Sequence, residues 1–275
     1  MSGASELAYN HIPMRNFIKD AFLDWMLGEI EGWLGYTISA SPLPEIMRST
    51  HAGAISPLGG KWNFWHNPID PPSQFTILHE LMHVVLHIEG WPMWATHRSI
   101  GTNNLLDELW SRVINFPQHV IINDRMHILK SISQDEQKPA MDNNVDSVKN
   151  QEQNPPFLQQ EITVEVKIHA IASAELMLSP PDLLPDRIDR NVLQKDYPQC
   201  WILADSICRD VEMHRPLDRQ SGAALLYKIL EMLSLPKENL RPLPSGTRYY
   251  PQFFDHMLVK IGQILDDRHT VSDRL

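Results

Sequence analysis

The segment that most restricts how this chain can fold is residues 74–89, a run that is apolar on nearly every side and contains no helix breaker. Ser73 stands directly before the run, where its side chain can cap the first turn of a helix. Gly90 and Pro92 follow the run, where a helix would end. A helix that is apolar all round must be covered by other parts of the chain, so the pattern predicts a buried helix.

Two histidines and a glutamate interrupt this apolar run in the order His79-Glu80-Leu-Met-His83. Four residues advance a helix by about 6 Å and turn it about 40° beyond one full turn, so both imidazoles can reach one zinc ion at roughly 2.0–2.1 Å. Glu80 lies about 100° round the helix from His79, where it can take a proton from a zinc-bound water. Burying these groups costs several kcal/mol unless each has a partner. A zinc ion is the simplest common partner; the alternative is core histidines bonded to backbone carbonyls or to carboxylates.

A catalytic zinc ion takes three protein ligands and keeps one position for water, so the motif needs a third side chain. His87 stands about 12 Å from His79 along the helix axis and is therefore expected to be a packing residue. Glu89 occupies the place of the third histidine in metzincin-type sites, but those sites need a glycine where this chain has Leu86. The third ligand is therefore expected from outside this helix.

Glu108 is the expected third ligand. It lies 25 residues after His83, which leaves enough chain to turn and to run a second helix back beside the first. A glutamate from such a helix is typical of gluzincin metallopeptidases, and residues 108–111, Glu-Leu-Trp-Ser, resemble their Glu-x-x-Ser/Asp motif. Asp107 is a second candidate, although an acid in the first turn also interacts favourably with the helix dipole. Glu108 can alternatively pair with Arg112, one helical turn further on.

Residues 75–87 read Phe-Thr-Ile-Leu-His-Glu-Leu-Met-His-Val-Val-Leu-His and resemble the hallmark FTxAHELGHxxLH of the ImmA/IrrE-type metallopeptidases. The resemblance implies a zinc-dependent peptidase with a zincin-like core, in which His79, His83 and a glutamate on the following helix bind the metal. It implies that Glu80 is the general base. It also implies a peptide or protein substrate, such as a transcriptional regulator in a stress-response or mobile-element system.

The chain departs from this family at Met82, where the family has glycine. It also has no clear Glu-Ala-Asn-x-Phe-Ala-x-Glu-Leu-Leu-Met-Pro block after the motif. Residues 113–117 and residues 174–180 are each similar to part of that block. If the second segment is the equivalent one, the resemblance implies a third ligand from a later set of polar residues: Glu165, His169 or Glu175.

A peptidase of this kind also needs a donor that stabilises the tetrahedral oxyanion. The sequence offers five candidates and does not choose among them: His97, His119, His127, Tyr249 and Tyr250. A non-catalytic alternative is a regulatory binding module of a stress-response or mobile-element system, in which a metal only supports a pocket. Glu80 argues against this alternative, because a structural zinc site needs no water-activating acid. A third possibility is a metallohydrolase that acts on something other than peptides.

The charge and the cysteines restrict the partners and the compartment. A net charge of -10 argues against non-specific nucleic-acid binding, which needs Lys and Arg to neutralise phosphates. The N-terminus has no signal-peptide pattern and no apolar run approaches the ~20 residues that span a bilayer, so no membrane association is expected. Cys200 and Cys208 are about 12 Å apart along a predicted helix, too far for a disulfide. Two reduced thiols predict a cytoplasmic protein.

The predicted fold class is α+β and mostly helical. A zincin-like core over residues 1–130 combines the motif helix with a short sheet, which includes a strand after the glycine turn in residues 59–66. A polar stretch over residues 131–160 is typical of a linker or disordered insertion, and residues 161–275 form a mainly helical region. Residues 161–169 alternate like a strand, while the residues after them favour a helix. Further helices are predicted over residues 13–35, 199–212, 219–234 and 251–267.

Overall fold

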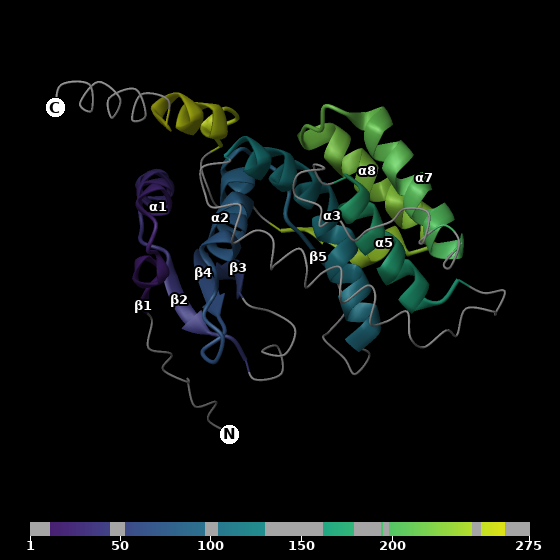
Figure 1. Cartoon of the computed structure of the whole chain (residues 1–275), viewed down its shortest axis with the longest axis horizontal. Coiled ribbons are helices and arrows are strands. Elements are labelled where there is room, and N and C mark those ends of the chain that lie inside the picture. The colour runs from purple at the N-terminus through teal and green to yellow at the C-terminus, as the bar shows by residue number, and fades with distance from the viewer. Residues whose placement is uncertain are drawn as a thin grey trace. The chain divides into compact units, whose positions relative to one another are not determined.

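A computed structural model of the chain describes residues 12–44, 53–96, 104–129, 162–178, 194, 198–243 and 249–261. These residues are mostly helical and include a four-stranded and a two-stranded sheet (Figure 1), which confirms the predicted α+β class. By its contacts the chain forms two compact units, Met1–Trp91 with Gly246–Leu275, and Pro92–Ser245. A membrane-spanning helix, which would need a long apolar stretch, does not occur among the described residues.

In the first unit, a four-stranded sheet has the order β1-β2-β4-β3. Its strands are β1 (Ile12–Pro13), β2 (Ser39–Pro42), β3 (Gly53–Leu58) and β4 (Lys61–His66). β2 runs parallel to β4, whereas β3 is antiparallel to β4 and joined to it through Gly59 and Gly60. These glycines have φ angles of 58° and 81°, the left-handed values that a two-residue hairpin turn favours. The predicted glycine turn and strand over residues 59–66 are confirmed.

The helix α1 (Ala21–Leu34) is shorter than the helix predicted over residues 13–35. The prediction is right from residue 21 onward and wrong before it. Asp20 causes the difference, because its carboxylate accepts hydrogen bonds from the N–H groups of Phe22 and Leu23 and so starts the helix there. The residues before Asp20 form β1 and the short 3-10 helix η1 (Met14–Phe17).

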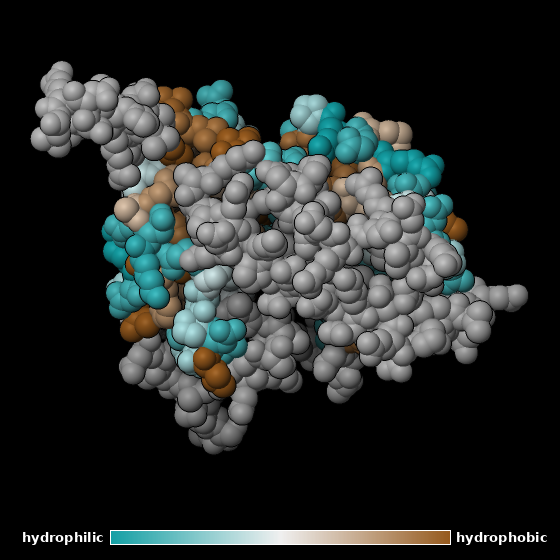
Figure 2. Space-filling view, viewed as in Figure 1, coloured by the Kyte–Doolittle hydropathy of each residue, from teal (hydrophilic) through white to brown (hydrophobic). Residues whose placement is uncertain are grey.

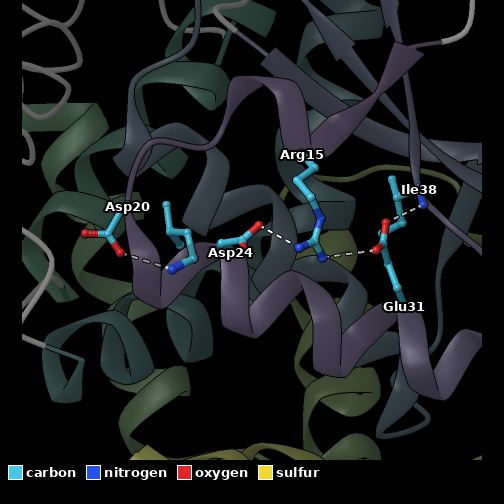
Figure 3. A network of polar contacts seen from close by, with 6 residues as sticks. Arg15, Asp20, Asp24, Glu31 and Ile38 are labelled. Atoms are coloured by element: carbon cyan, nitrogen blue, oxygen red, sulfur yellow. Dashed lines mark hydrogen bonds and ion pairs between the residues drawn. The ribbon is translucent and has the colours of Figure 1, made fainter.

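A charged network joins η1 to α1 and to the start of β2 (Figure 3). The guanidinium of Arg15 pairs with Asp24 at 2.8 Å and with Glu31 at 3.5 Å. Glu31 also accepts a hydrogen bond of 2.8 Å from the N–H of Ile38, which directly precedes β2. Arg15 and Glu31 thereby link η1, α1 and the residue before β2.

The HExxH motif lies on α2 (Gln74–Ile88). The Ser73 hydroxyl oxygen accepts the N–H of Thr76 at 3.0 Å, and Gly90 ends the helix with a φ of 88°. Apolar side chains are buried on every side of the helix: Phe75, Ile77, Leu78, Leu81, Met82, Val84, Val85, Leu86 and Ile88. The buried helix predicted over residues 74–89 is confirmed to within one residue at its end.

A C-terminal helix belongs to the same unit as α2. The helix predicted over residues 251–267 is present from 253 to 261, the last described residue. The Glu89 side chain, which is only 5% exposed, accepts a hydrogen bond of 3.0 Å from the N–H of Phe254. Glu89 therefore caps the first turn of this helix, a role that its metzincin-like position in the sequence does not reveal.

The second unit is built from helices and a two-stranded sheet. Its elements are β5 (Trp94–Thr96), α3 (Asn104–Ile128), α5 (Val164–Leu178), α7 (Pro198–His214), α8 (Arg219–Met232), η4 (Lys237–Asn239) and β6 (Leu240–Pro242). Apolar side chains of the four α-helices form one hydrophobic cluster. The helices predicted over residues 199–212 and 219–234 are confirmed. α3 is grouped here with the later helices, and the predicted linker over residues 131–160 lies outside the described residues.

Strand-like alternation and a helix were both open for residues 161–169, and the structure has a helix, because α5 begins at Val164. Val166 and Ile168, two residues apart, point to nearly opposite sides of a helix. Both are buried, since α5 packs against α3 as well as against α7. A helix covered on two sides has apolar residues at both positions, and this spacing imitates the alternation of a strand.

Both cysteines are free and buried on α7. The Sγ atoms of Cys200 and Cys208 lie 3.8 Å from the backbone carbonyl oxygens of Val166 and Ala174 of α5. Burial raises the pKa of the Cys200 thiol to about 11, so this group stays protonated at neutral pH. The cysteines serve as small packing residues between two helices.

Hydrophilic and hydrophobic residues are interspersed over the described surface in Figure 2. Exposed large apolar side chains come from separate elements, such as Ile69 ahead of α2, Ile202 of α7 and Val259 of the helix over residues 253–261. Scattered side chains of this kind are normal on a folded protein and do not mark a binding surface.

Candidate metal centre

His79 and His83 lie one helical turn apart on α2. Their ring centroids are 5.0 Å apart and the planes meet edge to face at 77°. Both side chains are half-buried, so their polar nitrogens are only partly hydrated. The spacing predicted from the sequence therefore places two imidazoles side by side on one helix face, as a shared metal ion requires.

Glu80 points from α2 to the sheet. Its Oε2 atom accepts a hydrogen bond of 2.8 Å from the N–H of Ile55 in β3. Alternate N–H groups of an antiparallel strand point away from the partner strand, so Ile55 can bond to Glu80 while β3 stays paired with β4. The carboxylate is thus fixed between the motif helix and the last strand of the sheet.

Burial raises the pKa of the Glu80 carboxyl to about 8, and the hydrogen bond from Ile55 opposes this shift. A carboxylate in such a place is poorly stabilised as an anion unless a cation lies near it. A divalent ion held by His79 and His83 would supply that positive charge. The chemistry of this donor set, two imidazoles with a buried acid beside them, therefore fits a zinc ion.

His87 is a packing residue, as its position along α2 predicts. It is 7% exposed, and its ring lies edge to face against Trp62 with centroids 5.2 Å apart. Its Nδ1 atom has no hydrogen-bond partner among the described residues. Burial lowers the pKa of His87, so the ring is neutral near pH 7.

Glu108, the ligand expected from the sequence, is paired with Arg112 on α3. Two guanidinium nitrogens lie 3.0 Å from its Oε1 atom, and the Glu108 side chain is 40% exposed. The described contacts therefore show the Glu108–Arg112 pair, which the four-residue spacing in the sequence allows. Glu165 and His169 of α5, two further candidates, are close enough to Glu108 and Arg112 for these charges to influence the pKa of His169, which burial chiefly lowers.

His119 of α3 pairs with a carboxylate of the same unit. Its Nδ1 atom lies 3.0 Å from Oε1 of Glu175 on α5, and the two side chains are 24% and 19% exposed. Within the first unit, His79 and His83 offer two ring nitrogens that could share a metal ion.

The two tyrosines named as oxyanion donors take part in packing. A Cβ atom on Gly90 would clash with the Tyr249 ring, so these two residues are in close contact. The Tyr250 ring packs against Trp33, with centroids 5.0 Å apart, and against Phe253. His127 lies in the last turn of α3, and His97 lies outside the described residues. The oxyanion donor stays unassigned.

Neither a scan against models of known protein families nor searches of curated proteins and of solved structures found a match for this chain. The resemblance of residues 75–87 to the ImmA/IrrE-type metallopeptidases stays a prediction. The case for a function therefore depends on the chemistry of the chain's own side chains.

Proposed function

We propose that the chain is a zinc-dependent metallopeptidase with a zincin-like core. His79 and His83 bind the metal in this proposal, Glu108 is the third ligand that the sequence leads us to expect, and Glu80 is the general base. The observation that carries it is the placement of Glu80, a buried carboxylate that is hydrogen-bonded to a sheet strand and flanked on its own helix by the histidine pair.

Glu108 is proposed as the third ligand on its position in the sequence. Its side chain is 40% exposed, so its carboxylate can exchange Arg112 for a metal ion. Three protein ligands would leave one position of a zinc ion for water. A zinc ion held there would lower the pKa of a bound water to about 7 and would polarise a carbonyl oxygen.

Glu80 would move the proton that peptide hydrolysis requires. Its carboxylate accepts a proton from water and then gives it to the leaving amine. The hydrogen bond from Ile55 holds the carboxylate in one orientation throughout.

The position of β3 supports a peptide as the substrate. β3 is the last strand in the order of the sheet, and its residue Ile55 contacts the general base. Extended peptides commonly bind by adding a strand to such an edge. The resemblance to the ImmA/IrrE type makes a transcriptional regulator the first substrate to examine.

The test is metal content, measured by elemental mass spectrometry on the full chain and on single variants. We expect about one zinc per chain in the wild type, and loss of zinc in H83A and E108A. Zinc that is kept in E108A but lost in H83A would assign the third ligand to another residue. No zinc in the wild type, even after zinc is supplied, would contradict the proposal.

Hydrolysis is tested separately, with a library of internally quenched peptides and the variant E80Q. We expect E80Q to keep its zinc and to lose activity by about 10²–10⁴-fold, because only the proton transfer is removed. A zinc-loaded wild type that cleaves no peptide would favour the non-catalytic regulatory binding module.

A further inference from the structure

We infer that Gly53 of β3 is a positioning residue for Glu80. Its missing side chain lets β3 approach α2 closely enough for the N–H of Ile55 to hold the Glu80 carboxylate. The inference rests on the proposed function, in which Glu80 is the general base. All the residues that carry it belong to the first unit. Gly53 would act through the backbone of β3 and would not itself take part in the proton transfer.

Gly53 is needed for space and not for a special backbone conformation. Its φ angle is outside the left-handed region that favours glycine. A Cβ atom built on it would lie 3.1 Å from Cζ of Phe64 in β4 and 3.3 Å from Cγ2 of Thr76 in α2. Carbon atoms in good contact are about 3.5–4.0 Å apart, so a side chain at this position would force its neighbours apart.

The close contact at Gly53 is followed by a second contact one step further along both elements. Thr76 and Glu80 are four residues apart on α2, which is a rise of about 6 Å. Gly53 and Ile55 are two residues apart on β3, which is a rise of about 6.8 Å. Because these steps nearly match, the two elements meet at the Gly53–Thr76 contact and again at the hydrogen bond of 2.8 Å. The separation of β3 from α2 at the first contact therefore sets the donor–acceptor distance at the second.

Phe64 closes the space around Gly53 from the side of the sheet. Its side chain is 0% exposed, and it stands opposite Ile55 in the pairing of β3 with β4. A Cβ atom at Gly53 would press on this packed ring as well as on α2. A close-packed core passes such a shift on, so β3 would move away from α2. A hydrogen bond weakens with distance and misalignment, so Glu80 would be held less well.

The experiment measures hydrogen exchange of the Ile55 amide by NMR on the full, metal-free chain, with E80A as the reference for a lost hydrogen bond. We expect the protection factor of this amide to fall about 3–10-fold in G53A, as for a weakened hydrogen bond, and further in E80A. The double variant G53A/T76S should recover part of the loss. Serine lacks the Cγ2 atom of Thr76 and keeps the hydroxyl that lies 3.0 Å from Oγ of Ser73.

A54G is the matched control. Ala54 is the next residue of β3, and its side chain points to the opposite face of the sheet. A54G makes β3 more flexible without adding an atom on the side of α2, so the protection of Ile55 should stay close to that of the wild type. Equal losses of protection in G53A and A54G would mean that only strand flexibility matters, which overturns the inference.

Wild-type protection of the Ile55 amide in G53A would also overturn the inference. If G53A alone does not fold, the same comparison is made between G53A/T76S and T76S. The Phe64 ring still crowds position 53 in the double variant, so its protection should be the lower of the two. Equal protection in these two variants would overturn the inference.

A second readout connects this geometry to the proposed chemistry. Zinc content is measured in G53A, together with kcat and KM for the library peptide that the wild type cleaves fastest. We expect wild-type zinc, wild-type KM and a kcat lower by about 3–10-fold, since a misplacement of 1 Å can cost about 10²-fold and this one is smaller. An unchanged kcat beside a weakened Ile55 hydrogen bond would overturn the positioning role and leave a peptidase in place. Loss of zinc from a folded G53A would overturn it as well, because the displacement would then reach the histidines.

Failure of the proposed function gives a different set of results. They are a wild type that binds no zinc, a zinc-loaded wild type that cleaves no peptide, and a zinc-loaded E80Q as active as the wild type. Each of these overturns the inference together with the proposed function. An unchanged Ile55 amide in G53A overturns the inference alone.

Discussion

Glu80 has surroundings that work against its own negative charge. Its carboxyl group is buried between α2 and β3, with a single described hydrogen bond from a backbone N–H. Its pKa is raised to about 8, so it is mostly protonated at neutral pH when no cation is present. A metal ion on His79 and His83 would reverse this balance and make the group a base. The acid is therefore suited to a site that contains a cation.

The first prediction concerns the pH dependence of stability in the metal-free protein. Glu80 has a pKa of about 8 in the folded protein and a model value of 4.5, so between these limits the folded state binds more protons than the unfolded state. Its contribution to stability is full below pH 4.5 and is lost as the pH rises to 8, by at most about 1.4 kcal/mol per pH unit. The variant E80Q does not titrate and lacks this contribution.

Urea unfolding in EDTA at pH 5, 6.5 and 8 checks this prediction. The difference between the wild type and E80Q should shift in favour of E80Q as the pH rises. His87 has the opposite effect, because its lowered pKa gives stability that is lost as the pH falls through 6.5. Both proteins contain His87, so the comparison cancels it. A difference that is constant over this range would contradict the environment described for Glu80.

The second prediction concerns two glycines with opposite surroundings. Gly90 has a φ of 88° and a Cβ atom there would clash with the Tyr249 ring, so G90A should lower the free energy of unfolding by about 1–2 kcal/mol. Gly32 is exposed in the last turn of α1, with nothing within 4 Å of a built Cβ, so G32A should raise the free energy of unfolding by at most about 1 kcal/mol. Thermal unfolding measures both. Equal effects of the two substitutions would contradict the turn assigned to Gly90.

At the scale of elements, α2 is held at its C-terminal end by a segment far away in the sequence. The N–H of Tyr250 donates to the carbonyl oxygen of Ile88 at 2.8 Å. Glu89 caps the helix that begins at residue 253, and Lys260 of that helix pairs with Glu29 of α1 at 2.6 Å. The motif helix is therefore anchored by backbone contacts that do not involve its histidines.

The third prediction follows from this anchor. E89A leaves the buried N–H of Phe254 without its acceptor, which should cost about 1–3 kcal/mol of unfolding free energy. E89Q keeps an acceptor oxygen and should cost less. Urea unfolding measures the stability of both variants, and elemental analysis measures their zinc. Zinc loss in a folded E89Q would show that Glu89 is a ligand, as in metzincin-type sites, and not a cap.

At the scale of the whole molecule, a metal that binds only the folded chain must stabilise it. The fourth prediction is that EDTA lowers the thermal midpoint of the zinc-loaded wild type, since a ligand at 1,000 times its dissociation constant adds about 4 kcal/mol. H83A should not respond to EDTA, because it lacks one of the proposed ligands. H87Q changes a histidine of the same helix that is outside the proposed ligand set, and it should respond like the wild type. An EDTA response in H83A as large as in the wild type would contradict the ligand set.

The local features of the site could be predicted from the sequence. Ser73, Gly90 and the spacing of His79 and His83 act over a few residues, and helix geometry alone relates them. The sequence left two alternatives open where an element is packed on two sides, as in α5, because burial on opposite helix faces imitates a strand. The prediction failed at Asp20, where one side-chain cap outweighs an apolar pattern that continues through it.

The sequence by itself determined that a buried helix carries two imidazoles one turn apart with a carboxylate between them. Only the tertiary structure decided which distant residues contact the polar side chains of this helix and of α3. Ile55 reaches Glu80 across 25 positions, Glu175 reaches His119 across 56, and Phe254 reaches Glu89 across 165. Such pairs depend on how distant segments pack, and many residues of the same type compete for each partner. The covalent chain and helix geometry set the spacing of neighbouring residues, whereas the packing of distant segments in the folded core sets which residues become partners.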